Sequence, residues 1–268
     1  MDFDHSAVFL HTFKCVLRTL KYSEMDPNVI PNVSVDCVLI GYNLRTLNVL
    51  LIERHMEYEG VHYLDMKLPG DLVRWNEDID DSAHRILHDL TGLRDVNLRQ
   101  LRAFGGLSRL NREPRDMEWL RRIDHPEERV ITVAYYSLIN LDLIQSQDFV
   151  PLPQARWVPI AELGRLAFDH NLIIERALTS LRTHIKDSPV AFELLPLKFT
   201  LTQLQWLYEA VMGTSYDKRN FRKKIGQLRC VVPINEKQTH VAHKPARYYM
   251  FSREVYHATR KDSFDFTV

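Results

Sequence analysis

The segment Gly70–Leu93, GDLVRWNEDIDDSAHRILHDLTGL, constrains the fold of this chain more than any other segment. Asp80 and Asp81 stand where carboxylates interact favourably with the dipole of a helix start. Gly92 is placed to end the same helix. The segment is therefore predicted to form a loop, a helix and a second loop.

This segment resembles the Nudix box, a loop–helix–loop that binds a magnesium-bound diphosphate and is written GX5EX7REUXEEXGU. The frame is kept by Gly70, Glu77, Arg85, Leu87, Thr91, Gly92 and Leu93. The helix glutamates are not kept, because Ile86, Asp89 and Leu90 take their places. Magnesium needs several hard oxygen ligands. The motif therefore predicts a domain that binds a ligand without cleaving it, with no catalytic residue, metal or cofactor.

Length and composition favour a soluble protein of one large or two ordinary domains, since the chain has 268 residues, 45% of them hydrophobic. No apolar run reaches the roughly 18–20 residues that span a bilayer, and the acidic start MDFDHSAVFL does not resemble a signal peptide. The three cysteines, Cys15, Cys37 and Cys230, are far apart and odd in number. They favour a reducing cytoplasm. The lack of a long apolar run favours no membrane association.

The net charge of zero hides an asymmetry. Residues 186–268 carry 14 Lys and Arg against 8 Asp and Glu, a net charge of +6, whereas the rest of the chain carries 21 against 27. A basic end on a neutral chain is typical of a sensor domain joined to a nucleic-acid-binding domain, although chance could also produce it.

Residues 33–186 have the pattern of an α/β/α sandwich. Strands are expected at 33–42, 47–54, 96–107, 129–140 and 155–160. Helices are expected within the box segment, from near Asp80 to Gly92, after Pro159 and at 171–186. The first two strands are too apolar to have one face in water. An amphipathic helix at 5–22 and a linker at 24–32 precede them, and 109–128 is a charged insertion. We divide the chain into a helical extension (1–32), a Nudix-like domain (33–186) and a third domain (187–268).

The third domain is expected to be a winged helix-turn-helix. Thr200 or Thr202 can cap a helix that runs to Gly213, and Asp217 can cap a second, basic helix from Lys218 to Leu228. Strands at 231–234 and 247–251 can pair as a wing, whose tip would hold Lys237, His240, His243 and Lys244. Arginine suits guanine and asparagine suits adenine in the major groove, so Arg219, Asn220 and Arg222 are the expected base readers. The alternative is a solvated charged helix face. The full expected DNA-binding set is Lys218, Arg219, Asn220, Arg222, Lys223, Lys224, Lys244 and Arg247, in which Lys223, Lys224 and Lys244 contact phosphate.

These pieces, in their order, resemble the Nudix-related transcriptional regulators of the NrtR/AraR type, closest to the arabinose-responsive branch of Bacteroides-like bacteria. The matching blocks are the box, AFGGLSR (103–109), ERVITVAYYSLIN (128–140), AFDH (167–170), FTLTQLQWLYEAVMG (199–213), DKRNFRKKI (217–225) and HKPARYYMF (243–251). The resemblance implies a ligand-sensing domain, a DNA-binding domain, a homodimer on double-stranded operator DNA, and repression relieved by a small effector. The chain departs from the family in its N-terminal extension, in the insertion 110–123 and in a wing that has His243-Lys244 where Gly-Arg is usual.

The expected effector cleft is the old substrate cleft. Its expected lining is Asp65, Lys67, Asp71, Arg74, Glu77, Arg129, Asp169 and His170. Acidic groups in that set and Asp89 favour a neutral pentose such as L-arabinose, whereas a phosphorylated effector would need arginines. Each of these residues could instead brace a loop, and Asp169 could cap a helix.

We therefore expect a repressor of sugar-utilisation genes that is not an enzyme. The alternatives are a Nudix hydrolase of ADP-ribose or a related nucleoside diphosphate, and a pure interaction module.

Overall fold

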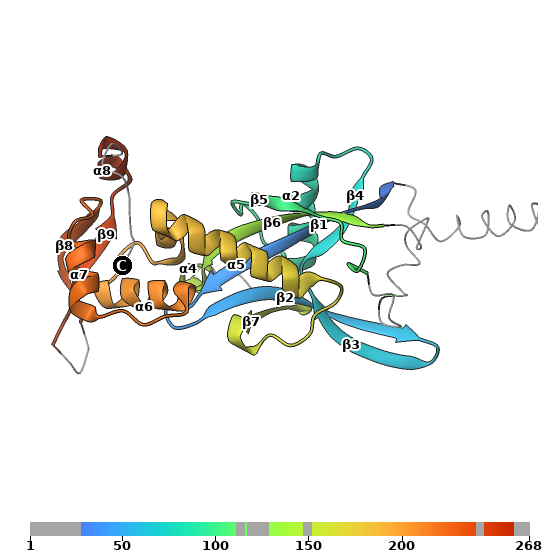
Figure 1. Cartoon of the computed structure of the whole chain (residues 1–268), viewed down its shortest axis with the longest axis horizontal. Coiled ribbons are helices and arrows are strands. Elements are labelled where there is room, and N and C mark those ends of the chain that lie inside the picture. The colour runs from blue at the N-terminus through green and yellow to red at the C-terminus, as the bar shows by residue number, and fades with distance from the viewer. Residues whose placement is uncertain (1–27, 111–115, 117–128, 147–151, 240–243, 260–268) are drawn as a thin grey trace, which may run out of the picture.

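The computed structural model describes residues 28–110, 116, 129–146, 152–239 and 244–259. They form a long seven-stranded sheet with a smaller helical unit at one end (Figure 1). The strands are β1 (Val29–Tyr42), β2 (Leu47–Tyr58), β3 (Val61–Lys67), β4 (Gly70–Arg74), β5 (Arg99–Phe104), β6 (Ile131–Asn140) and β7 (Ala155–Pro159). No helix within the described ranges is long and apolar enough to cross a membrane.

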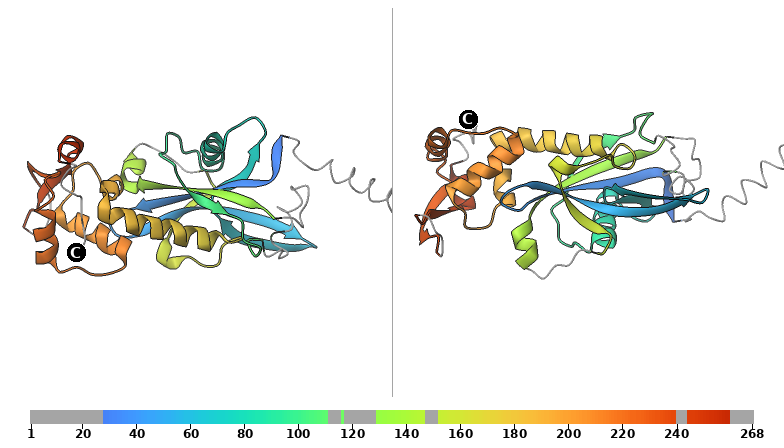
Figure 2. Two further views of the ribbon diagram at one scale, coloured as in Figure 1. Left: turned by 45° about the horizontal axis from the view of Figure 1, so that its top comes forward. Right: turned by 90° about the horizontal axis from the view of Figure 1, so that it is seen from below.

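The two long central strands, β1 and β6, organise the sheet. They pair in parallel from Val33 opposite Ile131 to Tyr42 opposite Asn140, and the main strand order is β3-β2-β1-β6-β5. Strand β4 also pairs with β1, and β7 with β2. Helices α2 (Ile79–Thr91) and α5 (His170–Asp187) cover opposite faces (Figure 2). This arrangement confirms the expected α/β/α sandwich.

Both faces of β1 are buried, as its composition predicted. Val35, Cys37 and Leu39 belong to the apolar cluster on the α2 side, whereas Val38 and Ile40 belong to the cluster on the α5 side. Successive strand residues point to opposite faces, so Asp36, between these sets, points toward α5. A carboxylate inside an apolar strand needs partners, which the site described below supplies.

The box helix α2 begins and ends where the sequence indicated. The side chain of Asp78 accepts a hydrogen bond from the backbone N–H of Ile79, and Gly92 ends the helix with φ of 81°. Ahead of it, Gly70–Arg74 form strand β4 rather than a loop, because Gly70 lies against Asp36 of β1. A Cβ at Gly70 would lie 2.0 Å from Oδ1 of Asp36, so glycine is required at this position.

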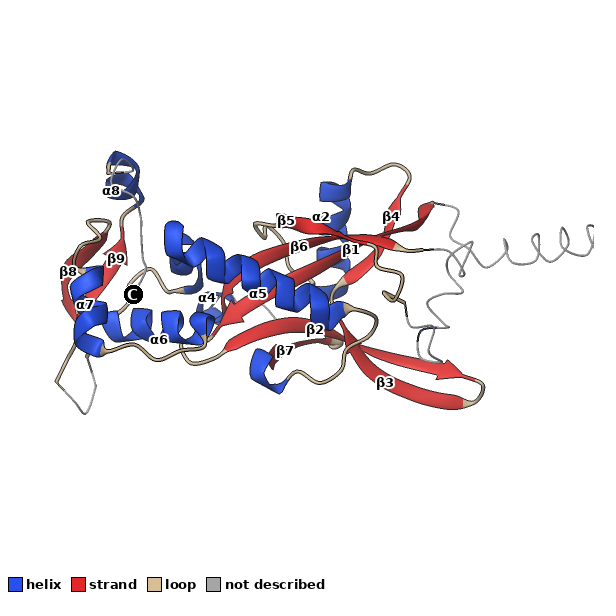
Figure 3. Ribbon diagram, viewed as in Figure 1, coloured by secondary structure: helices blue, strands red, loops and turns tan. Residues whose placement is uncertain are grey.

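The C-terminal unit contains α6 (Leu201–Met212), α7 (Lys218–Ile225), β8 (Val231–Lys237), β9 (Arg247–Phe251) and α8 (Arg253–Ala258). Figure 3 shows the order of helices and strands in this unit. The 3-10 turn η2 (Pro189–Leu194) connects it to α5. One apolar cluster runs from the α5 face of the sheet through η2 into α6, α7 and β8, so the two parts of the chain share a core.

Several sequence expectations need correction. Residues 29–32 extend β1 instead of forming a linker, because Val29 is buried against Leu72 and Val130 and pairs with β4 across a bulge. The strand expected at 96–107 is only Arg99–Phe104, and the segment after Pro159 is only the turn η1 (Ile160–Glu162). The basic helix ends at Ile225 rather than Leu228.

Strands β3 and β4 and helices α4 (Leu141–Ser146) and α8 were not expected. The expected helix at 5–22 and nearly all of the insertion 109–128 lie outside the described residues.

Candidate functional site

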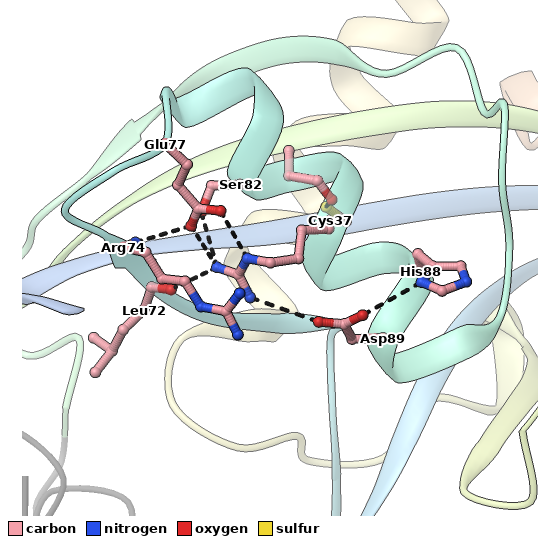
Figure 4. Close-up of polar contacts among 9 residues, drawn as sticks. Cys37, Leu72, Arg74, Glu77, Ser82, His88 and Asp89 are labelled. Atoms are coloured by element: carbon pink, nitrogen blue, oxygen red, sulfur yellow. Dashed lines mark hydrogen bonds and ion pairs between the residues drawn. The ribbon is translucent and has the colours of Figure 1, made fainter. Parts of the chain in front are cut away.

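Arg85 of α2 binds Glu77 of the box loop and thereby braces this loop against the helix. Figure 4 shows Glu77 with its neighbours Arg74 and Ser82. The Arg85 guanidinium donates to both carboxylate oxygens of Glu77, at 2.7 Å from Nε and 2.5 Å from Nη2, and also to the carbonyl of Leu72 at 3.1 Å. Glu77 accepts two further hydrogen bonds, from the Ser82 hydroxyl at 2.7 Å and the backbone N–H of Arg74 at 2.8 Å. Arg85 therefore has a structural role in this loop. Glu77, which was expected to line the cleft, is engaged as a brace.

The brace should make stability depend on pH. The hydrogen bond from Arg85 is the main reason why the pKa of Glu77 falls from 4.5 to about 2. A carboxyl whose pKa is depressed in the folded state stabilises the fold above its unfolded pKa, and this contribution is lost as the pH falls through the folded pKa. We expect Glu77→Gln to lower the free energy of unfolding by about 2 kcal/mol at pH 7, and by progressively less as the pH falls from about 4.5 toward 2.

Urea unfolding at pH 7, 5 and 4 measures this difference. Glu162→Gln, at an exposed position, is the matched control and should change stability little at any of these pH values. A Glu77→Gln effect of the same size at pH 7 and pH 4 would mean that shape, not charge, accounts for the brace.

The three box positions that normally carry metal ligands do not fit a magnesium ion. Ile86 is 1% exposed inside the apolar cluster on the α2 side, and Leu90 packs against the same cluster. Asp89 is half exposed and lies 3.9 Å from Nη1 of Arg85. In the described part of the chain, His, Cys, Asp and Glu do not gather in any group of three that could hold a metal. These positions therefore do not supply the set of oxygen ligands that an octahedral magnesium site requires.

The remaining expected ligand residues gather near the start of β1, but several are already paired. Asp65 receives two hydrogen bonds from Arg54, at 2.8 and 2.7 Å, and the Arg54 guanidinium also lies 3.3 Å from Asp116. Lys67 donates to the carbonyl of Gly70 at 2.6 Å. Asp71 is half buried on β4, where it pairs with Val35. Arg74 and Arg129 are exposed, and they flank the start of β1, because Arg74 pairs with Val29 and Arg129 precedes β6.

Asp169 and His170 belong to a buried ionic group whose other members, Asp36 and Arg109, were not predicted. Arg109 contacts Asp169 through Nη1 and donates to Asp36 at 2.8 Å through Nη2. His170 is 1% exposed, accepts from the backbone N–H of Leu68 at 2.9 Å, and lies 3.4 Å from Asp36. We call Asp36, Arg109, Asp169 and His170 the α5 anchor. Asp169 occupies the N-cap position of α5, as the alternative expected, but its side chain makes no capping hydrogen bond and contacts Arg109 instead.

The two carboxylates of the α5 anchor differ in their acidity. Burial alone would raise the pKa of Asp36, but His170 and Arg109 outweigh it and hold that pKa well below its usual range. Burial raises the pKa of Asp169, because the opposing effect of Arg109 is smaller. The pKa of Asp36 is lowered and that of Asp169 is raised, although both carboxylates contact the same guanidinium. Asp36 interacts with the charges of His170 and Arg109 and also has hydrogen bonds from His170 and Thr132, whereas at Asp169 the lowering effects of Arg109 and His170 do not outweigh burial and the negative charge of Asp36.

Helices α6 and α7 form the expected helix pair. Thr200, not Thr202, caps α6, and its hydroxyl and the side chain of Gln203 form a reciprocal capping box. Gly213 ends α6 with φ of 68°, a left-handed conformation that favours glycine. The carboxylate of Asp217 accepts from the backbone N–H of Asn220 at 2.8 Å and caps α7.

Helix α7 presents its basic side chains to solvent. Phe221 and Ile225 are buried, and Phe221 packs edge-on against Tyr208 of α6 with ring centroids 5.8 Å apart. The five exposed members of the expected DNA set on this helix are Lys218, Arg219, Asn220, Arg222 and Lys223, while Lys224 is half buried. The basic face is therefore positioned by a packed apolar face.

Strands β8 and β9 form the expected wing. Val231 pairs with Phe251 and Pro233 with Tyr249. Lys244 and Arg247 are exposed, and Nε of Arg247 donates to the carbonyl of Ile234 at 3.0 Å. The expected tip residues His240 and His243 lie outside the described residues. Tyr249 and Phe251 of β9 pack against the apolar cluster, and Phe251 stacks on Phe192 with ring centroids 4.5 Å apart.

Comparisons with known proteins agree with this geometry. Residues 191–251 match the family model of the NrtR DNA-binding winged helix domain. The ADPR responsive transcriptional repressor NtrR of Acinetobacter baylyi is 28% identical over 230 residues, which are 84% of each chain. The crystal structure of Shewanella oneidensis NrtR complexed with a 27mer DNA superimposes with a TM-score of 0.62 at 26% identity, covering 82% of this chain and 94% of that one. A MutT/nudix family protein from Enterococcus faecalis shares the fold, with a TM-score of 0.57, 21% identity and coverage of 94% and 100%.

These findings support a Nudix-like α/β domain followed by a winged helix domain, the architecture of the NrtR structure. The winged helix assignment to residues 191–251 agrees with the unit that the fold separates from the sheet. The closer resemblance to the arabinose-responsive branch is not supported, because the curated relative is named as responsive to ADP-ribose.

Proposed function

We propose that this protein is a transcriptional repressor whose winged helix domain binds operator DNA and whose Nudix-like domain binds ADP-ribose without hydrolysing it. The observation that carries the proposal is the combination of an exposed basic α7, on a rigid helix pair, with a box helix whose metal positions are apolar. The similarity to a curated ADP-ribose-responsive repressor over 84% of both chains supports it.

Operator recognition would follow the usual geometry of this motif. As a homodimer, the protein would place two α7 helices in successive major grooves about 34 Å apart. Arg219, Asn220 and Arg222 would read bases, and Lys223, Lys224 and Lys244 would contact phosphates, with Lys218 and Arg247 beside them. Because both the Nudix-like domain and the C-terminal unit share one apolar cluster, a shift in the first would reach the second.

ADP-ribose replaces the pentose expected from the sequence for a physical reason. The acidic residues that favoured a neutral sugar do not form a free acidic surface, because Asp65 is paired with Arg54 and Glu77 with Arg85. Arg74 and Arg129 are exposed cationic groups at this end of the sheet. A guanidinium group can donate two parallel hydrogen bonds to a phosphate. A diphosphate therefore fits these residues better than a neutral sugar does.

The absence of hydrolysis rests on the box helix. Cleavage of a diphosphate in a Nudix site requires carboxylates around magnesium to polarise the phosphate and activate water. Ile86 and Leu90 cannot supply them, and Glu77 is engaged with Arg85. We therefore expect ADP-ribose to be released from the protein intact.

Binding of the purified protein to its own upstream DNA, measured at fixed salt by fluorescence anisotropy, tests the proposal. ADP-ribose is expected to weaken operator binding by about 10- to 100-fold, within the usual range of coupling between two sites. L-Arabinose, ribose 5-phosphate and ADP serve as comparison ligands and should have smaller effects. Phosphorus NMR of ADP-ribose incubated with protein and magnesium should show no AMP.

Each alternative outcome has a distinct meaning. Release of operator DNA by L-arabinose alone would show that the effector is a sugar and not ADP-ribose. Magnesium-dependent formation of AMP without specific DNA binding would identify a hydrolase of nucleoside diphosphates. Failure of both DNA binding and ligand binding would favour an interaction module.

A further inference from the structure

Helix α5 joins the effector end of the sheet to the DNA-binding unit (Figure 1). Its 18 residues span about 27 Å at the rise of an α-helix. Near its C-terminal end, Nε of Arg182 donates to the carbonyl of Val211 at 2.9 Å, and the hydroxyl of Tyr208 donates to the carbonyl of Ile185 at 3.4 Å. Tyr208 in turn packs against Phe221 of α7. A displacement of α5 along or about its axis would therefore move α6 and the basic helix.

The α5 anchor ties the other end of this helix to three further segments. Asp36 belongs to β1, Arg109 follows the glycine-rich loop after β5, and Leu68, which donates to His170, lies in the turn between β3 and β4. The side chains of Arg109, Asp36 and Asp169 are 4%, 6% and 14% exposed. A guanidinium buried between two carboxylates has few alternative positions, because separation would leave a charge without a partner.

The segments that meet at the anchor also carry the proposed effector residues. Lys67 donates to Gly70 in the β3–β4 turn, and Gly70 touches Asp36. A Cβ at Gly105 would lie 3.8 Å from Cδ of Arg129, so the Arg129 side chain rests against the loop that leads to Arg109. A ligand that moved either Lys67 or Arg129 would thus move a segment fixed to the anchor.

Phe168, which precedes the N-cap residue of α5, has a strained backbone conformation. Its φ is 54°, in the left-handed region that is unfavourable for a residue with a Cβ. Two contacts hold it there: the guanidinium of Arg54 lies 4.9 Å from the ring centroid, and the ring of His170 lies edge-on at 5.3 Å. Strained residues of this kind persist where the surroundings determine them strongly, and they cluster at switch regions.

We propose that the α5 anchor transmits effector binding to the winged helix domain, with Arg109 as the positioning residue that couples the two sites. This inference rests on the proposed function, because it assigns the route by which ADP-ribose weakens operator binding. A positioning role predicts that changes at the anchor alter the coupling between the sites more than they alter either binding affinity. Coupling is the ratio of the operator Kd with saturating ADP-ribose to the operator Kd without it.

Asp169→Asn tests the proposal, because it keeps the size of the side chain and removes the charge that faces Arg109. In this variant, operator Kd without effector and ADP-ribose Kd from calorimetry should each stay within about 3-fold of wild type, while the coupling should fall from the wild-type 10- to 100-fold to below about 3-fold. Arg109→Lys keeps the positive charge without the forked geometry, and should give an intermediate coupling. The matched control is Glu53→Gln on β2, which removes the charge that contacts Arg156 of β7 and His55 and that forms no ion pair with the four residues of the anchor in the described part of the chain.

The outcomes separate the inference from the function on which it rests. Wild-type coupling in both anchor variants would overturn the inference. No effect of ADP-ribose on operator binding by the wild-type protein would overturn the proposed function instead. Hydrogen exchange in the wild type gives a reading that depends on no variant: ADP-ribose should change the protection of the Leu172 and Ile173 amides, which bond to the carbonyl of Asp169. Unchanged protection with ligand bound would also overturn the inference.

Discussion

Replacing Arg219 and Arg222 together by alanine is expected to lower affinity for the operator by about 100- to 1,000-fold at fixed salt. Both side chains are exposed on α7, whereas Phe221 between them is buried. A bidentate contact from arginine to a base contributes about 1–3 kcal/mol of discrimination. The loss should therefore be large for the operator and smaller for random DNA, where contacts to phosphate dominate.

The measurement is fluorescence anisotropy with operator and random duplexes over a range of salt concentrations. Arg176→Ala removes an equivalent charge from an exposed position on α5, and should leave operator binding nearly unchanged. Thermal unfolding checks that the double variant remains folded. Equal losses on operator and random DNA would assign both arginines to phosphate contacts, and unchanged operator binding would remove α7 from the interface.

The basic helix pair could be predicted from the sequence because its signals are local. Thr200, Gly213 and Asp217 occupy capping and turn positions whose preferences arise from a few neighbouring atoms. The same holds for the box helix, whose C-terminal glycine was recognised. The end of the basic helix differs from the prediction, because α7 ends at Ile225, before Gly226, and not at Leu228.

The hairpin of β2 and β3 shows a signal that was present and not used. Glu59 and Gly60 connect the strands, and both have positive φ, at 51° and 76°, as a two-residue hairpin turn requires. The mixed polar sequence of β3, VHYLDMK, has only one buried residue, Asp65. Alternation of apolar and polar residues therefore could not reveal this strand.

The pairing of charges around the effector site could not be predicted in the same way. Arg109 and Asp169 are 60 residues apart and meet only because β1, the loop after β5 and the start of α5 converge. Asp169, which looked like a ligand contact in the sequence, is therefore paired with an arginine from a distant segment. Asp65 and Glu77 are instead paired with Arg54 and Arg85, which are close to them in the sequence. The sequence contained one signal of this pairing. Asp36 lies within the apolar run of β1, and a buried carboxylate needs a partner, but the sequence does not identify that partner.

The second large effect is expected from restoring a carboxylate to the box helix. Ile86→Glu should lower the free energy of unfolding by about 3–5 kcal/mol at pH 7, because position 86 is 1% exposed among apolar side chains and a buried charge without a partner costs about that much. Burial would raise the pKa of the new carboxyl above its unfolded value. The destabilisation should therefore grow as the pH rises above about 4.3 toward the folded pKa, and should be smaller at pH 5 than at pH 7.

Denaturant unfolding at pH 5 and 7, together with phosphorus NMR of ADP-ribose and magnesium, measures both consequences. Asp89→Glu is the matched control, since it completes a second box position that is half exposed and should change stability by less than about 0.5 kcal/mol. Neither variant is expected to cleave ADP-ribose, because Leu90 still lacks a carboxylate and Glu77 remains bonded to Arg85. A stable Ile86→Glu protein that released AMP would mean that the helix can turn this face to the ligand, and that a single residue separates this binding domain from a hydrolase.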